Sequence, residues 1–222
     1  MDLSQEVGLE FLGHDGFLIN YKDKKIVIDP YNLQKRIDAD IILITHGHYD
    51  HCSIKDLEKV IKLGSIVVCP ADCQSKLLKF EKINLQIIEA GEVLDFGNVK
   101  IEAVSAYNIN KDFHPKSEGW IGYIVKLDGV VIYHAGDTDY IPEMQKLSGY
   151  GKHGNKFVVL LPVSGKYVMD SEEAVDAASI MSPDVAVPMH YGAGVAGTIE
   201  DAKRFVELCK ERNINAVLLE KI

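Results

Sequence analysis

The chain has 222 residues, of which 47% are hydrophobic and 26% charged, and its formal net charge is −9. Such a chain can bury a large interior, and its longest apolar runs are too short to span a membrane, so an ordinary globular protein is expected. The negative charge argues against long nucleic acids as partners, because such a surface repels a phosphate backbone.

The N-terminal segment MDLSQEVGLEF has neither the basic region nor the apolar region of a secretory signal, so a cytoplasmic location is expected. The cysteines do not have the spacing of a zinc ribbon, and their even number means little without an export signal. They are therefore predicted to be small buried thiols rather than a disulfide or a cysteine metal site: Cys52, Cys69, Cys73 and Cys209.

The first half of the chain begins with patterns that are typical of β-strands. Residues 7–21 alternate in hydrophobicity, residues 24–30 are rich in β-branched side chains, and turn residues separate the two. Residues 39–46 form a nearly continuous apolar run that ends in a group of histidines. Such a run is typical of a strand that is buried on both faces.

A helix is predicted over residues 53–64. Ser53 can cap it with Asp56 in the capping-box position, an apolar stripe follows, and Gly64 ends it. The remaining elements of this half are a strand at 65–70, a short helix at 71–80, and strands at 85–90, 91–98 and 99–107.

The second half repeats this order of strands and helices. It is predicted to contain a hairpin at 120–139, a short helix at 141–147, strands at 156–164 and 184–192, helices at 170–181 and 198–213, and a closing strand at 215–222. Two β-rich halves, about 1–105 and 106–222, are therefore predicted to share one domain of residues 1–222, with helices on the outside.

The segment THGHYDHCS (45–53) holds three histidines and an aspartate within six positions. His46 and His48 lie on one side of an extended segment and can bind one ion, whereas the turn into the helix returns Asp50 and His51 to a second position. Imidazole and carboxylate ligands suit zinc, manganese or iron. The alternative is a chance run of surface polar residues, against which the buried strand leading into HxHxDH argues.

This segment resembles the HxHxDH signature of the metallo-β-lactamase superfamily. HAGDTD (134–139) and PMHYG (188–192) are similar to later motifs of that family. GHDGFLI (13–19) and IDPY (28–31) resemble the first strands of the branch that contains ascorbate-6-phosphate lactonase and uncharacterised metal-dependent hydrolases. The resemblance implies an α/β fold, an αββα four-layer sandwich of two mixed β-sheets with helices on the outer faces and metals at one edge.

The resemblance also implies a set of metal ligands: His46 and His48 for the first ion, Asp50, His51 and His190 for the second, and Asp137 between the two. The first ion needs one more histidine, and related branches place it where this chain has Asn108. Either His114, six residues later, reaches the ion, or Asn108 or water takes that position. His114 is favoured, because a site with only two imidazoles would bind weakly.

Several residues outside this set admit two interpretations. His14 points into the site to hold substrate or a ligand, or it is an ordinary loop histidine. Asp29 accepts a hydrogen bond from a metal-binding histidine, or it only forms a turn. His134 is expected to contact a metal-binding residue or to lie in the core rather than to bind metal itself, and Trp120 is expected in the core rather than as an aromatic platform. Three lysines that flank the expected pocket either attract an anion or are simply solvated: Lys111, Lys116 and Lys166.

The functional hypothesis is a metal-dependent hydrolase whose dinuclear site activates water to attack a small anionic ester, lactone or phosphodiester. The two divalent ions would be zinc, with manganese or iron as alternatives, and the expected catalytic residues are Asp50, Asp137 and His14. The alternative functions are a nuclease-type phosphodiesterase and a non-hydrolytic di-metal redox or sensor protein. A small-molecule substrate and no membrane partner are expected, and a homo-oligomer stays open.

Overall fold

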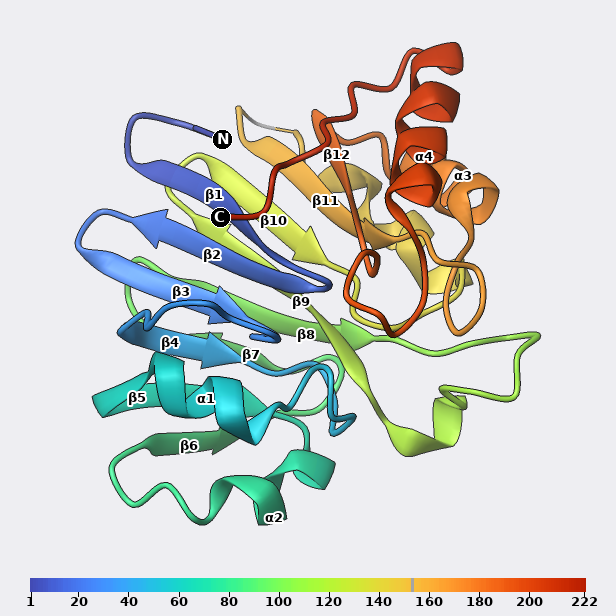
Figure 1. The fold of residues 1–222 in the computed structure, drawn as a ribbon. Helices are drawn as coiled ribbons and strands as arrows, with labels where there is room; N and C mark the ends of the chain where they lie inside the picture. Colours follow the sequence, from blue (N-terminus) through green and yellow to red (C-terminus); the bar gives the residue numbers. More distant parts are fainter. Residues whose placement is uncertain (153) are drawn as a thin grey trace.

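Two six-stranded mixed β-sheets lie face to face at the centre of the protein (Figure 1). The computed structural model describes residues 1–152 and 154–222. The first sheet consists, in spatial order, of β1 (Val7–Gly13), β2 (Gly16–Tyr21), β3 (Lys24–Ile28), β4 (Ala39–Leu43), β5 (Ile61–Cys69) and β6 (Asn84–Ile87). Strands β1 to β3 are antiparallel and β3 to β6 are parallel. β4 lies in the interior of this sheet and is mostly apolar, as is typical of a strand covered on both faces.

The second sheet has the spatial order β12-β11-β10-β9-β8-β7. Its strands are β7 (Val93–Asp95), β8 (Lys100–Ser105), β9 (Ile121–Leu127), β10 (Val130–His134), β11 (Lys156–Pro162) and β12 (Val185–Met189). Strands β7 to β10 are antiparallel, whereas β10 to β12 are parallel. The predicted hairpin is confirmed as β9 and β10, in which Leu127 pairs with Val130.

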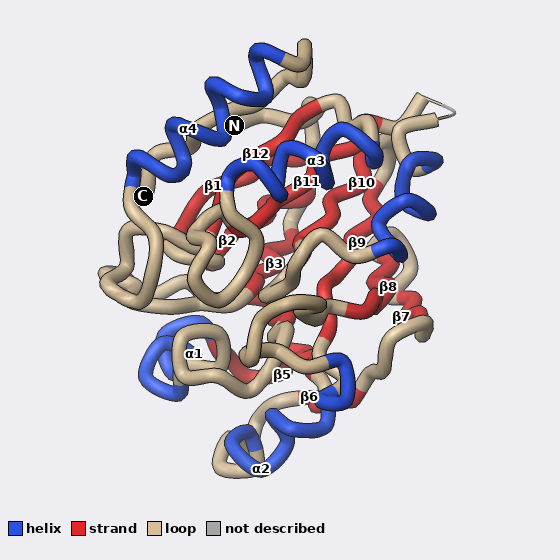
Figure 2. Tube along the Cα trace, turned by 90° about the vertical axis from the view of Figure 1, so that its right-hand side faces the viewer, coloured by secondary structure: helices blue, strands red, loops and turns tan. Residues whose placement is uncertain are grey.

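Helices cover the outer faces of both sheets and complete four layers (Figure 2). The helices are α1 (Ile54–Val60) and α2 (Gln74–Leu77) on the first sheet, and α3 (Ser171–Met181) and α4 (Ile199–Glu211) on the second. Three 3₁₀ segments lie between them: Ala71–Cys73, Lys116–Glu118 and Pro142–Gly149. The αββα sandwich expected from the sequence is confirmed.

The chain passes from one sheet to the other earlier than the boundary near residue 105 suggests. β6 ends at Ile87 in the first sheet, and β7 begins at Val93 in the second. β8 belongs to the second sheet because its whole length pairs with β9, with Ala103 opposite Tyr123. The second sheet therefore takes two of its strands from the first half of the sequence.

The helix predicted over 53–64 is shorter than expected, and its capping box is absent. It ends at Val60, because the chain from Ile61 onward pairs with β4 as the start of β5. Ser53 makes no side-chain bond to the helix backbone; its hydroxyl donates to Asp56 Oδ2 (2.7 Å) instead. The carboxylate of Asp56 is buried and accepts backbone N–H groups from the distant segment 32–33.

We expect Asp56→Asn to lower the free energy of unfolding by about 2 kcal/mol at pH 7, since buried hydrogen bonds to a charged group are lost. Burial alone would raise the pKa of Asp56, but hydrogen bonds from Ser53 and Lys59 lower it. Its stabilisation is therefore complete above the unfolded pKa of about 4 and is lost as the pH falls through the lower folded pKa. Urea unfolding at several pH values measures this.

The control for this prediction is Asp38→Asn, because Asp38 is exposed and pairs only with the exposed Arg36 (2.8 Å). Removing an exposed ion pair changes stability by less than about 1 kcal/mol. An Asp56→Asn variant as stable at pH 7 as Asp38→Asn would show that the Asp56 contacts contribute little.

The closing strand predicted at 215–222 is wrong, because this segment makes only single bridges to two different sheets. Ala216 pairs with Ala186 in β12, and Lys221 pairs with Phe11 in β1. The segment crosses from the edge of the second sheet to the edge of the first (Figure 1), so neither sheet has enough consecutive pairs for a strand. The segment therefore connects edge strand β12 of the second sheet to edge strand β1 of the first.

The burial of the cysteines is consistent with a core built around the two sheets. All four cysteines are buried and free, as expected. Within residues 1–152 and 154–222, no helix has the length and apolar character needed to cross a bilayer.

Candidate metal centre

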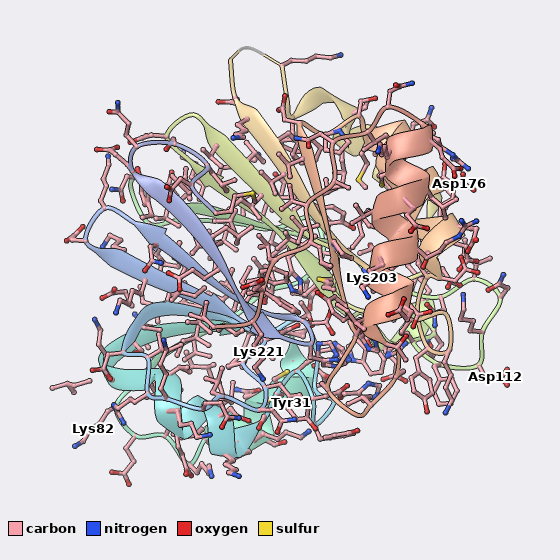
Figure 3. The ribbon with its side chains drawn as sticks, turned by 45° about the horizontal axis from the view of Figure 1, so that its top comes forward. Tyr31, Lys82, Asp112, Asp176, Lys203 and Lys221 are labelled. Carbon is pink, nitrogen blue, oxygen red and sulfur yellow. The ribbon has the colours of Figure 1, made fainter. Side chains whose placement is uncertain are left out.

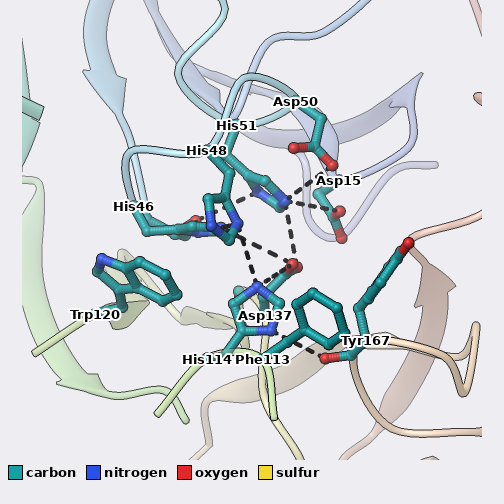
Figure 4. A network of polar contacts seen from close by, with 12 residues as sticks. Asp15, His46, His48, Asp50, His51, Phe113, His114, Trp120, Asp137 and Tyr167 are labelled. Atoms are coloured by element: carbon teal, nitrogen blue, oxygen red, sulfur yellow. Dashed lines mark hydrogen bonds and ion pairs between the residues drawn. The ribbon is translucent and has the colours of Figure 1, made fainter. Parts of the chain in front are cut away.

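Side chains from five loops meet at one edge of the sandwich, between the two sheets. Figure 4 shows those of Asp15, the HxHxDH group, His114 and Asp137. The loop between β1 and β2 carries His14 and Asp15, and the loop from β4 into α1 carries the HxHxDH group. His114 lies in the long loop before β9, Asp137 follows β10, and His190 follows β12. These five residues are buried, so their polar atoms face one another rather than water.

Three imidazoles and one carboxylate form the first group of facing atoms. His46 Nε2 lies 3.0 Å from His48 Nδ1, which lies 3.3 Å from His114 Nε2. Asp137 Oδ2 lies 3.1 Å from His114 Nε2 and 3.9 Å from His46 Nε2. The four ligand atoms lie within 4.8 Å of one another, close enough to bind one ion together.

Asn108 does not join this group but holds the loop that carries His114. Its amide nitrogen donates to the carbonyl oxygens of Phe113 (2.8 Å) and Tyr167 (2.7 Å). Its backbone N–H donates to His114 O (2.7 Å). Of the two side chains considered from the sequence, His114 is therefore the one that lies against His48.

A second group lies beside the first and shares Asp137 with it. His51 Nε2 lies 3.3 Å from Asp137 Oδ1, and His190 Nε2 lies 3.4 Å from Asp137 Oδ2. His14 Nε2 lies 2.9 Å from Asp50 Oδ2, which is 3.7 Å from His51 Nε2. The carboxylate of Asp137 thus contacts both groups.

Asp15 lies in the second group as well, although the sequence interpretation did not single it out. Its Oδ2 atom lies 3.4 Å from His14 Nε2, 3.7 Å from His51 Nε2 and 3.9 Å from His190 Nε2. The sequence HDG places it next to His14, but aspartate before glycine is also typical of an ordinary turn. Only the folded chain distinguishes these two meanings.

The outward nitrogens of the histidines are held by the protein. His51 Nδ1 donates to Asp29 Oδ2 (2.8 Å), so the contact expected between Asp29 and a histidine of the site is present. His114 Nδ1 donates to the carbonyl oxygen of Tyr167 (2.9 Å). Because a neutral imidazole carries one proton, each of these rings then offers a lone pair at Nε2 toward the cluster.

The backbone at the site is held in an uncommon conformation. Four residues of the site have a left-handed backbone: His14 (φ 58°), Asp29 (φ 41°), His114 (φ 57°) and His190 (φ 62°). This conformation is costly for residues other than glycine and concentrates at functional sites. Gly136 (φ 64°) precedes Asp137, and a Cβ there would lie only 2.8 Å from Ile121 O, so this position requires glycine.

The histidines and carboxylates of the cluster shift one another's pKa values. Burial alone would lower the pKa values of His51 and His190. The nearby carboxylate of Asp137 has the larger effect, so the pKa of His51 is raised and that of His190 is raised to about 9. Burial would raise the pKa of Asp137, but His51 and His190 hold it well below its usual value. These imidazoles therefore attract protons at neutral pH, and a metal ion that binds there would displace them.

Several buried polar atoms of the cluster have no hydrogen-bond partner among residues 1–152 and 154–222. They include His51 Nε2, Asp137 Oδ1 and both carboxylate oxygens of Asp15. Buried polar atoms are nearly always paired, and an unpaired buried carboxylate is costly. Cations would satisfy all of these atoms at once, so the donor set fits metal ions that prefer imidazole and carboxylate ligands.

Trp120 lies against the histidines of the first group, and the prediction that it belongs to the core is wrong. Its ring centroid lies 4.9 Å from that of His46 and 4.7 Å from that of His48. Its Nε1 donates to Asp72 Oδ2 (2.8 Å), which also accepts the backbone N–H of Gly47 (2.8 Å). This link holds the indole against the histidine loop and away from the sheets.

A hollow of about 270 Å³ opens over both groups and has room for a small ligand. Its rim is aromatic, with Tyr49 63% and Phe113 50% exposed. A neighbouring hollow lies on the His14 side and is lined by Tyr31 and Lys221 (Figure 3). None of the described residues that line the first hollow is a lysine or an arginine.

The three lysines that flank the site are engaged by other side chains. Their contacts are with acidic or aromatic groups: Lys111 with Asp139 and Glu173, Lys116 with Glu143 (2.9 Å), and Lys166 with the ring of Tyr167 (4.8 Å). The charges of Lys111 and Lys116 are therefore paired with carboxylates, and none of the three lysines lines the hollow.

Comparison with known proteins identifies relatives that match nearly the whole chain. A model of the beta-lactamase superfamily domain matches residues 8–190. A UPF0173 metal-dependent hydrolase of Thermoplasma volcanium is 34% identical over 194 residues, covering 84% of each chain. A UPF0173 metal-dependent hydrolase of Thermococcus onnurineus is 33% identical over 211 residues, covering 90% of this chain and 92% of that protein.

Solved structures have the same arrangement of sheets and helices. A crystal structure of a Parabacteroides distasonis protein, named as a metal-dependent hydrolase, has a TM-score of 0.81 at 29% identity and covers 96% of this chain and 94% of its own. The metallo hydrolase Igni18 of Ignicoccus hospitalis has a TM-score of 0.77 at 23% identity, covering 98% and 96%, and shows the fold alone. The chain therefore belongs to the metallo-β-lactamase superfamily, as one of its metal-dependent hydrolases.

Proposed function

We propose that the protein hydrolyses a small ester, lactone or phosphodiester with two divalent metal ions. His46, His48 and His114 would hold the first ion, Asp50, His51 and His190 the second, and Asp137 would contact both. The observation that carries this proposal is that ligand atoms from distant loops converge in three overlapping groups, within 4.8 Å in each. One surrounds the first position, and the other two, which share His51 and His190, surround the second. When bound, such ions activate water as a nucleophile and polarise the oxygen of the bond to be cleaved.

Three residues of the chain would assist the reaction. Asp137 keeps the two groups of histidines in register, because its two oxygens face different imidazoles. Asp50 lines the hollow and receives a hydrogen bond from His14 Nε2 (2.9 Å). We infer that this pair takes up the proton of the attacking water and returns it to the oxygen of the leaving group as the ester bond breaks.

The proposed substrate is small and is bound mainly by its apolar part and its reacting group. The aromatic rim formed by Tyr49 and Phe113 favours an apolar portion. Since no basic side chain of the described chain lines the hollow, an anionic group would be bound by the metal ions themselves. The net charge of −9 further disfavours the nuclease alternative.

The test of the proposed function combines elemental analysis with turnover. The purified protein is expected to contain two divalent ions per chain and to hydrolyse p-nitrophenyl esters, lactones or p-nitrophenyl phosphodiesters. Chelation should remove activity, and adding the metal back should restore it. Iron with oxygen uptake and without hydrolysis would instead support the redox alternative; the likeness to the diiron β-hydroxylase CmlA of Streptomyces venezuelae, at 15% identity, concerns the fold alone.

The third imidazole of the first group gives a separate prediction. His114→Ala should reduce the metal content from about two ions per chain to about one, because two imidazoles bind an ion weakly. Asp112→Ala is the matched control: Asp112 lies in the same loop with an exposed side chain, so this variant should keep both ions. An unchanged metal content in His114→Ala would mean that solvent or another residue completes the first group.

A further inference from the structure

Asp15 is the one carboxylate of the second group that the proposed function does not use. It lies with His14 in the two-residue loop between β1 and β2, where Gly13 pairs with Gly16. Its exposed fraction is 0%, and neither of its oxygens has a hydrogen-bond partner among residues 1–152 and 154–222. An aspartate with only a structural role in a turn would accept nearby N–H groups, which this one does not.

The loop that carries Asp15 is fixed against the second sheet. His190 N–H donates to His14 O (2.9 Å). His134 Nδ1 accepts the N–H of Gly136 (3.2 Å), so its proton is on Nε2, which donates to Asp15 O (2.8 Å). Both ends of the two-residue loop are thus tied to the opposite sheet, and the Asp15 carboxylate is held in the cluster.

The atoms around the Asp15 carboxylate are metal-ligand atoms. The Asp15 Oδ2 atom lies 3.4–3.9 Å from the Nε2 atoms of three histidines. With His51, His190 and Asp137 it forms a group in which one ligand atom of each residue lies within 4.8 Å of the others. These separations suit atoms that surround one ion, and none of them is a hydrogen bond to Asp15.

We propose that Asp15 is an additional ligand of the second metal position, and that this position takes a six-coordinate, oxygen-preferring ion such as Mn²⁺ or Fe²⁺ rather than Zn²⁺. The inference rests on the proposed two-metal function. The second position would then draw on three carboxylates, Asp15 and Asp137 in one group of facing atoms and Asp50 in the group that overlaps it at His51 and His190, whereas the first has three imidazoles and only Asp137. Carboxylate-rich sites suit manganese and iron, whereas zinc prefers four ligands rich in nitrogen or sulfur.

The experiment offers the metal-free protein equal amounts of Zn²⁺ and Mn²⁺ and measures both elements per chain after gel filtration. The wild-type protein is expected to retain about one zinc and one manganese. Asp15→Asn and Asp15→Ala should keep the zinc, and their affinity for manganese should fall at least about tenfold. Asp56→Asn is the matched control, because it removes a buried aspartate remote from the cluster and should keep both ions.

A second readout does not depend on metal analysis. The metal-free Asp15→Asn protein should melt at a higher temperature than the metal-free wild type, because it lacks a buried carboxylate without a partner. Adding Mn²⁺ should raise the melting temperature of the wild type strongly and that of the variant much less.

The outcomes separate this inference from the proposed function. Two ions in the wild type and in both Asp15 variants, with equal manganese affinity, would overturn the role of Asp15 alone. Two zinc ions in the wild type, one of them lost in the variants, would overturn the metal preference but keep Asp15 as a ligand. A wild-type protein that takes up no ions would overturn the proposed function and this inference together.

Discussion

Asp137→Ala is expected to purify without its full metal content and to lose hydrolysis by about 10³-fold or more, since metal activation of water contributes several kcal/mol to the rate. The physical reason is that the carboxylate of Asp137 faces both sets of histidines, with Oδ1 near His51 and Oδ2 near His114 and His190. Elemental analysis and turnover of an ester or phosphodiester measure the two effects on the same preparation.

The control for Asp137→Ala is Asp176→Asn on α3. Asp176 is exposed and pairs with Arg212 on the outer face, so its loss should leave metal content and turnover unchanged. Far-ultraviolet circular dichroism should show the same strand and helix content in both variants. A correctly folded Asp137→Ala protein with both ions and full turnover would contradict the shared role of this carboxylate.

His48→Ala is expected to lower the occupancy of the first metal position and to abolish measurable hydrolysis while the fold is retained. His48 is only half-buried, so the sheets do not depend on its packing. Its Nδ1 atom nevertheless lies between His46 Nε2 (3.0 Å) and His114 Nε2 (3.3 Å), at the centre of the first group. Metal titration by calorimetry and a turnover assay measure the two effects.

Full turnover by a folded His48→Ala protein would show that hydrolysis does not use the first position. A loss of turnover with an unchanged metal content would instead assign His48 a role in binding substrate. The melting temperature of the metal-free variant serves as the control, because it should equal that of the metal-free wild type within a few degrees.

The sequence places the local part of the predicted site on one short segment. His46, His48, Asp50 and His51 are neighbours in the chain, so the direction of a strand and the turn after it are enough to bring them together. The αββα layers follow from the family resemblance, and the hairpin of β9 and β10 follows from the hydrophobic pattern.

The parts that the sequence did not predict depend on contacts between distant segments. Asp15 is marked only by a turn pattern, and its burial arises because its loop is tied to His134 and His190 from the other sheet. The helix after Ser53 ends at Val60 because the chain that follows pairs with β4 as strand β5. Trp120 lies outside the core because its indole N–H donates a hydrogen bond to Asp72, which lies on a different loop.

The division of the 222 residues into two halves of one domain stays a prediction, and so does the oligomeric state. The two sheets share one large apolar core, which includes Tyr123 and Tyr133 of the second sheet and Phe17 of the first. A shared core of this kind argues for cooperative unfolding of both halves in a single transition.

Anomalous X-ray diffraction from crystals of the metal-loaded protein would test the two-metal centre most directly. The expected result is two peaks in each chain, one among His46, His48 and His114 and one among Asp50, His51 and His190, with Asp137 between them. The contradicting result is an absence of peaks at both positions in fully loaded crystals, or metal bound only elsewhere on the surface.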